Sequence, residues 1–188
     1  MNTENAATDA RHATWADMVW QQFGAAIDMF DNTLAACPDE LWTGRLWSAE
    51  EGPDTPPRFG EFWTIATHAV RWLERYLLAV PEDEFGSLET STTLTPFPEA
   101  NEPQTKSTVR DCLAQLRERC RSTLMELTDD QAQRPITGYD WIGTEPITVV
   151  ELQLYNMRHV QEHAAQMALF LGQHGVPDEK LDWIARAR

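Results

Sequence analysis

Residues 148–173 read TVVELQLYNMRHVQEHAAQMALFLGQ, and this stretch decides the fold. Its apolar side chains recur every three or four positions, which is the repeat of an amphipathic α-helix. The face that carries Leu152 and Phe170 also carries His159 and His163, because residues four apart are neighbours on a helix. The helix therefore turns two imidazole rings toward the protein interior, where an unpaired polar group is costly.

Three further segments have the same repeat and precede this one. The four helices are expected at about residues 14–36, 57–79, 107–127 and 148–173. Thr14 suits the N-cap of the first helix, and Pro57 suits the first turn of the second. A helical turn over residues 39–42 follows the first helix, and no segment has a convincing strand pattern. Four long amphipathic helices in one chain predict an all-α four-helix bundle.

The whole chain, residues 1–188, is expected to form one domain, with residues 1–12 as a loosely ordered tail. Residues 81–106 form a long loop between the second and third helices and are rich in Pro, Ser, Thr and Glu. A loop of this length is rarely an idle connection, so we expect it to cover one end of the bundle. The apolar residues that the short C-terminal segment offers for docking are Leu181, Trp183 and Ile184.

The chain is strongly acidic, with 30 Asp and Glu residues against 15 Lys and Arg and a net charge of −15. This charge repels phosphates and anionic lipids, so neither nucleic acid nor a membrane is expected as a partner. No run approaches the roughly 20 apolar residues of a membrane span, and the N-terminus lacks an apolar signal-peptide core. We therefore expect a cytoplasmic protein in which Cys37, Cys112 and Cys120 are reduced, small core residues.

The histidine pair of the last helix is a candidate metal site. Neutral imidazole is a common ligand for Zn, Ni, Cu and Fe, but two ligands alone hold an ion poorly. His68 also falls inside an expected helix, so it is the candidate third ligand beside His159 and His163. On a helical wheel His68 lies just beyond the apolar arc, near Glu61 and Arg75. The pattern leaves open whether His68 is a ligand at a cleft mouth or a plain surface residue.

Two established metal templates fit poorly. Residues 159–163 spell the His-x-x-Glu-His signature of inverted zinc proteases, which take a third ligand from a distant downstream glutamate. Glu179 is the only glutamate downstream, and it lies in the tail. Di-iron carboxylate bundles need Glu-x-x-His on two helices, but the positions three before the helical histidines hold Ile65, Asn156 and Val160. The sequence therefore disfavours both classes.

These motifs make the chain similar to the DinB-like (DinB/YfiT) superfamily of four-helix bundles. That family places one metal-binding histidine in its second helix and a His-x-x-x-His pair in its last. The matching residues are His68, in a His-x-x-x-x-x-Glu-Arg-Tyr-Leu run, and His159 and His163, in Arg-His-Val-Gln-Glu-His-Ala-x-Gln. The similarity extends over about residues 15–172 and includes the turn at 39–42. The resemblance implies that the three histidines bind one divalent metal ion.

What the resemblance implies for activity is less specific, since a fold is a weak guide to chemistry. Some relatives are metal-dependent transferases or isomerases that use low-molecular-weight thiols such as bacillithiol, mycothiol or glutathione. The first hypothesis is therefore an enzyme in which zinc or nickel activates a thiol or a water molecule against a small-molecule substrate. The second is a non-catalytic metal-binding or stress-associated bundle, and the third is that the histidines bind no metal. A homodimer is left open.

Three neighbours of the histidines are candidates for supporting roles. Tyr155 and Asn156 lie one turn before His159 and could orient a substrate or support a metal ligand. Glu162 could act as a base, although its position on the wheel points away from the histidines. Ordinary helix packing explains all three at least as well, so the sequence assigns none of them a role.

Overall fold

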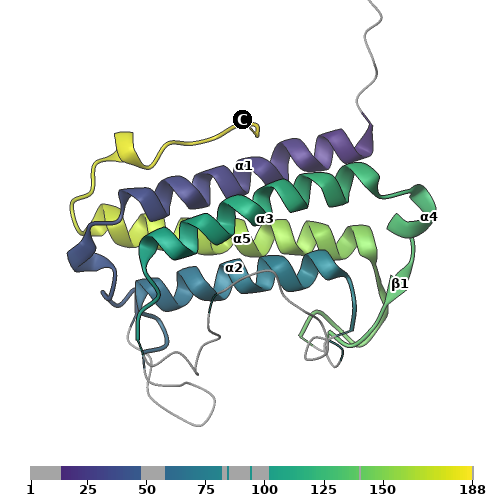
Figure 1. Cartoon of the computed structure of the whole chain (residues 1–188), viewed down its shortest axis with the longest axis horizontal. Coiled ribbons are helices and arrows are strands. Elements are labelled where there is room, and N and C mark those ends of the chain that lie inside the picture. Colours follow the sequence, from purple (N-terminus) through teal and green to yellow (C-terminus); the bar gives the residue numbers. More distant parts are fainter. Residues whose placement is uncertain are drawn as a thin grey trace, which may run out of the picture.

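The computed structural model describes residues 14–47, 58–81, 84, 94, 102–139 and 141–187. Its four long helices are α1 (Trp15–Ala36), α2 (Phe62–Leu78), α3 (Lys106–Glu126) and α5 (Val149–Gln173). α1 packs against α3 and α5, and α2 packs against the same two helices, so the four helices surround one core (Figure 1). This arrangement confirms the predicted all-α four-helix bundle.

Reciprocal capping explains why α1 and α5 begin where the sequence predicts. The Thr14 hydroxyl accepts a hydrogen bond from the Asp17 amide at 3.1 Å, and the Asp17 carboxylate accepts one from the Thr14 amide at 2.9 Å. Thr148 and Glu151 form the same capping box at the start of α5. Each box satisfies backbone amides that a helix start otherwise leaves unpaired.

The start of α2 differs from the prediction. We expected this helix from about residue 57, which lies outside the described residues, but it begins at Phe62. Arg58 and Gly60 have positive φ angles of 69° and 88°, so the preceding backbone forms a left-handed turn instead of a helix. The Phe62 amide donates to the Gly44 carbonyl at 2.8 Å, which ties the helix start to the loop after α1.

Short elements connect the long helices. The 3₁₀ turn η1 (Asp39–Leu41) follows α1, as predicted, and η3 (Asp178–Lys180) follows α5. Between α3 and α5 lie α4 (Asp129–Ala132) and the strands β1 (Pro135–Ile136) and β2 (Ile147–Thr148). The strands pair antiparallel, with Ile136 opposite Ile147. The expectation of no strand was wrong here, because two-residue strands are too short to show an alternating pattern.

The buried core confirms several sequence predictions and corrects one. Cys37, Cys112 and Cys120 are all buried, and none of the three forms a disulfide. In the C-terminal segment Ile184 is buried, but Trp183 is 77% exposed, so the expectation that Trp183 docks was wrong. The nearby Ala187 amide does reach the bundle, where it donates to the Gln21 carbonyl of α1 at 2.9 Å.

Most of the long loop at 81–106 and all of the tail at 1–12 lie outside the described residues. Within the loop, Leu94 is buried in the core, and its carbonyl accepts a hydrogen bond from Arg71 of α2 at 2.7 Å. Among the helices that the structure describes, none has both the length and the apolar character of a membrane span.

Candidate metal centre

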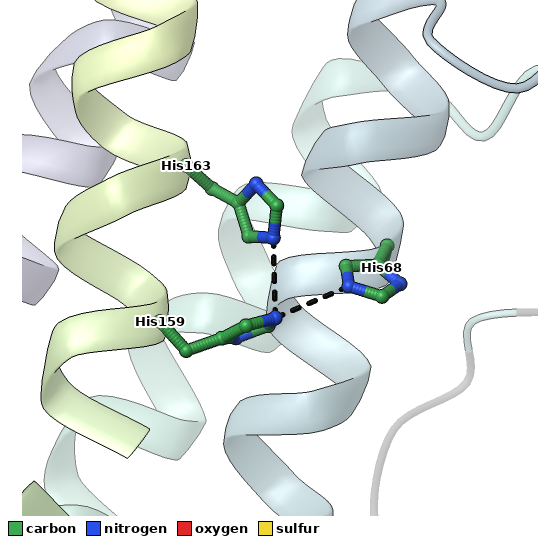
Figure 2. Close-up of side chains that lie close together, drawn as sticks. All are labelled: His68, His159 and His163. Carbon is green, nitrogen blue, oxygen red and sulfur yellow. Dashed lines mark hydrogen bonds between the residues drawn. The ribbon is translucent and has the colours of Figure 1, made fainter. Parts of the chain in front are cut away.

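Two adjacent helices carry the three histidines. His159 and His163 lie one turn apart on α5, and His68 lies near the middle of α2 (Figure 2). All three side chains point into the space between these helices. The His68 ring faces the other two histidines and does not stand alone on the surface, which argues against the plain surface residue that the sequence left open.

Two buried amides fix α5 against α2 beside the histidines. Gln153 Nε2 donates to the Tyr76 carbonyl at 2.7 Å, and Asn156 Nδ2 donates to the Leu73 carbonyl at 3.2 Å. Both amides are fully buried, where a hydrogen bond is costly to break. They set the relative position of the two helices within two turns of His159.

The Nε2 atoms of the three rings converge. His159 Nε2 lies 3.1 Å from His68 Nε2 and 3.1 Å from His163 Nε2, as the dashed lines in Figure 2 show. Each histidine offers one ring nitrogen such that these atoms all lie within 4.8 Å of one another. The structure thus brings together all three residues that the sequence predicts as ligands.

Burial keeps these rings neutral at physiological pH. It is the largest cause lowering the pKa of His68 to about 3, and the charges of His163 and Arg75 lower it further. Burial likewise lowers the pKa of His159 to about 3, with the other two histidines adding to the effect. The pKa of His163 is lowered by burial as well. A neutral ring keeps the lone pair that a metal ion requires.

A carboxamide sets the orientation of His163. Gln166 Oε1 lies 2.9 Å from His163 Nδ1, and an amide oxygen only accepts hydrogen bonds. The Nδ1 atom therefore carries the proton, and Nε2 presents its lone pair to the other histidines. Partners of this kind orient metal-ligating histidines in many proteins.

The donor set fits a transition-metal ion. Two nitrogens that each lie about 2.1 Å from one ion, at angles of about 90° to 110°, are roughly 3.0–3.4 Å apart. The His68–His159 and His159–His163 separations of 3.1 Å fall inside this range, and the third pair of nitrogens lies within 4.8 Å. Imidazole suits zinc, nickel, copper and iron, whereas calcium and magnesium prefer oxygen ligands. Three protein ligands also leave a coordination position for a further molecule.

Comparison with known proteins identifies the family of this chain. The sequence model of the DinB superfamily matches residues 22–167. The chain belongs to the DinB superfamily. A solved structure, described as a conserved protein of Enterococcus faecalis, is similar with a TM-score of 0.56 and 14% identity, covering 85% of this chain and 96% of that one. At that identity it supports the fold alone. The search of curated proteins finds no match.

Aromatic rings line one side of the site in this DinB superfamily chain. Tyr155 stacks on His159 with an interplanar angle of 18° and a centroid distance of 6.5 Å, and the edge-on Tyr76 ring lies 5.8 Å from His159. Trp72 lies 5.2 Å from Trp141, whose Nε1 donates to the Tyr76 hydroxyl at 3.2 Å. We define Trp72, Tyr76, Trp141 and Tyr155 as the aromatic wall.

Only part of this wall had a signal in the sequence. Trp72 and Tyr76 follow His68 at intervals of four residues, so a helical wheel could have grouped them with the histidine. Trp141 lies in the irregular connection between β1 and β2, and no periodicity predicts where such a residue packs.

Glu162 lies away from the histidines, as the wheel suggested. With Arg158 and Trp183 it lines a separate cavity of about 540 Å³ between α1, α5 and the C-terminal segment. Its carboxylate accepts a long hydrogen bond, 3.4 Å, from Gln166 Nε2. Glu162 therefore supports the partner of His163 and does not face the converging nitrogens.

Proposed function

We propose that His68, His159 and His163 bind one divalent metal ion, with zinc or nickel preferred, and that the loaded protein activates a thiol or a water molecule. The observation that carries this proposal is the convergence of three neutral Nε2 atoms from α2 and α5. Three partly buried imidazoles facing one another have little reason to meet unless a cation joins them, because each would otherwise compete for the same few hydrogen bonds.

The ligand set suits activation of a nucleophile. A divalent ion held by three neutral ligands keeps its full positive charge and lowers the pKa of a bound water or thiol toward neutrality. A low-molecular-weight thiol is the preferred co-substrate, because sulfur is a favoured partner of zinc and nickel and no cysteine of the chain joins the histidines. The substrate would then be a small electrophile.

The aromatic wall supports the same proposal through its effect on polarity. Trp72 and Tyr155 are only partly buried, so they combine apolar surface with access from outside. Tyr76 stays protonated, since burial raises the pKa of its hydroxyl far above neutrality. These side chains exclude water from one side of the histidines, and lower local polarity strengthens every electrostatic interaction there.

The test is the metal content of the untagged protein. We expect about one equivalent of zinc or nickel per chain, lost in His163→Ala and kept in His174→Ala. His174 is the matched control, because it ends α5 outside the cluster and bonds to the Phe170 carbonyl. Equal metal content in the two variants would refute the three-histidine site.

A non-catalytic ion is the second candidate, and one observation favours it. The cluster joins two different helices, so an ion there would fix α2 to α5. A purely structural ion predicts closed coordination and strong unfolding on chelation. A catalytic ion predicts that added thiols perturb the spectrum of a cobalt-substituted protein while the fold survives chelation.

A further inference from the structure

One histidine of the cluster lacks the support that another has. His163 bonds through Nδ1 to Gln166, but the Nδ1 atom of His159 is buried and has no hydrogen-bond partner in the part of the chain that the structure describes. Asn156, three residues earlier on the same face of α5, has a buried Oδ1 atom that also lacks a partner. A buried ring nitrogen and a buried amide oxygen, one turn apart, thus both lack a partner among the described residues.

The orientation of the Asn156 amide is fixed by its other contacts. Its Nδ2 atom lies 3.2 Å from the Leu73 carbonyl and 3.4 Å from Gln153 Oε1, and both of these atoms are acceptors. The amide nitrogen must therefore face α2, which leaves Oδ1 as an acceptor that needs a donor. On His159, Nε2 lies 3.1 Å from the Nε2 atoms of both other histidines, and the tautomer decides which of these nitrogens donates. A proton on Nδ1 would leave the Nε2 lone pair facing the cluster.

We propose that Asn156 is a positioning residue for His159. Its Oδ1 accepts the Nδ1 proton of His159, either directly after a small rotation of the His159 ring or through one buried water, and so directs the Nε2 lone pair into the cluster. Asn156, three residues before His159, would thus support that ring in the way that Gln166, three residues after His163, supports the other. The role of this bond in metal binding rests on the proposed function, but the bond itself belongs to the metal-free protein.

The first measurement uses the wild-type, metal-free chain. Long-range proton–nitrogen NMR spectra of the imidazole groups report which ring nitrogen carries the proton. We expect His159 to be protonated at Nδ1, with that proton slow to exchange with solvent because it is buried and bonded. A His159 ring protonated at Nε2 would overturn the proposal without any variant.

Two variants then distinguish the role of the Asn156 Oδ1 acceptor from that of the Nδ2 donor. Asn156→Leu removes both, whereas Asn156→Asp keeps the acceptor and loses the bond to Leu73. Gln153→Met is the nearest control, because it removes an equally buried amide that bonds to α2 through the Tyr76 carbonyl. It also removes the long 3.4 Å contact to Asn156 Nδ2, but the 3.2 Å bond from Asn156 to the Leu73 carbonyl still holds that amide.

The readouts are the His159 tautomer and the zinc dissociation constant, measured by competition with a chromogenic chelator. We expect Asn156→Leu to weaken zinc binding about 10- to 100-fold and to lose the fixed Nδ1–H signal. Asn156→Asp should stay within about threefold of wild type or bind more tightly, and Gln153→Met should not change the tautomer. If Asn156→Asp behaves like Asn156→Leu, or if Asn156→Leu behaves like wild type, the positioning role is wrong.

Failure of this inference is distinguishable from failure of the proposed function. A wild-type chain that binds neither zinc nor nickel refutes the metal site, while the NMR measurement on the same chain still decides whether Asn156 holds the Nδ1 proton. A wild-type chain that binds zinc with a tautomer independent of Asn156 refutes the positioning role alone.

Discussion

Two contacts between helices use polar residues in opposite ways. Where α1 meets α3, two aspartates of α1 each pair with an arginine of α3. Arg110 Nε and Nη2 donate to Asp31 at 2.8 and 2.9 Å, and Arg117 donates to Asp28 at 2.7 and 3.2 Å. We call this the α1–α3 seam. Both pairs are bidentate, and in each the carboxylate and the guanidinium satisfy one another; the Arg110 pair is partly exposed, whereas the Arg117 pair is mostly buried.

The α2–α5 seam, which holds the three histidines, has polar groups that are not all hydrogen-bonded. One ring nitrogen of each histidine points to a common space, but His159 Nδ1 and Asn156 Oδ1 have no partner among the described residues. Burial there is nearly total for Gln153 and Asn156. Charges are paired at the α1–α3 seam, whereas buried polar atoms at the α2–α5 seam lack partners among the described residues. This contrast supports the α2–α5 seam as the proposed binding site.

The largest expected effect is the gain in free energy of unfolding on zinc binding, which should depend on the α2–α5 seam and not on the α1–α3 seam. At a free zinc concentration about 1,000 times the dissociation constant, binding adds about 4 kcal/mol to the free energy of unfolding. We expect this gain in wild type and in Arg117→Ala, and its loss in His159→Ala, because only the last variant removes a ligand. Chemical denaturation with and without zinc measures it. A gain that survives in His159→Ala would place the ion elsewhere.

Acid should weaken the α2–α5 seam next. His68 and His159 have pKa values of about 3 in the fold, against about 6.5 for an unfolded histidine. The unfolded chain therefore takes up protons first as the pH falls, so this contribution to stability is complete above about pH 6.5 and is lost progressively toward pH 3.

The expected size of this acid effect is on the order of 2 kcal/mol between pH 7 and pH 5.5 in the metal-free protein. Urea denaturation at a series of pH values measures it. The matched control is again His174, which lies outside the cluster: His174→Gln should leave the pH profile unchanged, whereas His68→Gln should flatten it. Equal profiles for the two variants would contradict the role of burial.

How much of this molecule the sequence predicts depends on the range of the interactions involved. The limits of α5 follow from Thr148, the helical repeat and Gly175, all of which act within a few residues. The start of α2 was misplaced because the turn at Arg58 and Gly60 is set by bonds to Gly44 and its neighbours, which are distant in sequence.

The same distinction holds for the site. Two histidines on one helix were predictable from their spacing, but the orientation of His68 was not, since a wheel shows a helix without the partner it packs against. Trp141 was missed because it lies in an irregular connection. Whether the three histidines bind a metal remains a prediction for the experiments above.

Within the α1–α3 seam, the pair of Arg117 and Asp28 should matter more than its neighbour. Both side chains are less than one-fifth exposed, and the Arg117 guanidinium also lies over the Trp20 ring at 5.1 Å. We expect Arg117→Ala to cost about 1 to 2 kcal/mol of folding stability. A double-mutant cycle with Asp28→Ala, read by urea denaturation, isolates the pair. Zinc affinity should not change in either variant.

The smallest effect is expected for Arg110 and Asp31, whose side chains are 41% and 38% exposed. The geometry is as good as that of the Arg117 pair, so the two pairs differ mainly in access to water, which weakens the attraction between charges. We expect Arg110→Ala to cost at most about 0.5–1 kcal/mol, and less in 1 M salt, where screening removes most of the remaining attraction. A cost as large as that of Arg117→Ala, unchanged by salt, would mean that geometry and not burial sets the strength of the α1–α3 seam. That result would also remove the physical basis for contrasting the α1–α3 seam, whose charges pair with each other, with the α2–α5 seam, for which we propose a ligand.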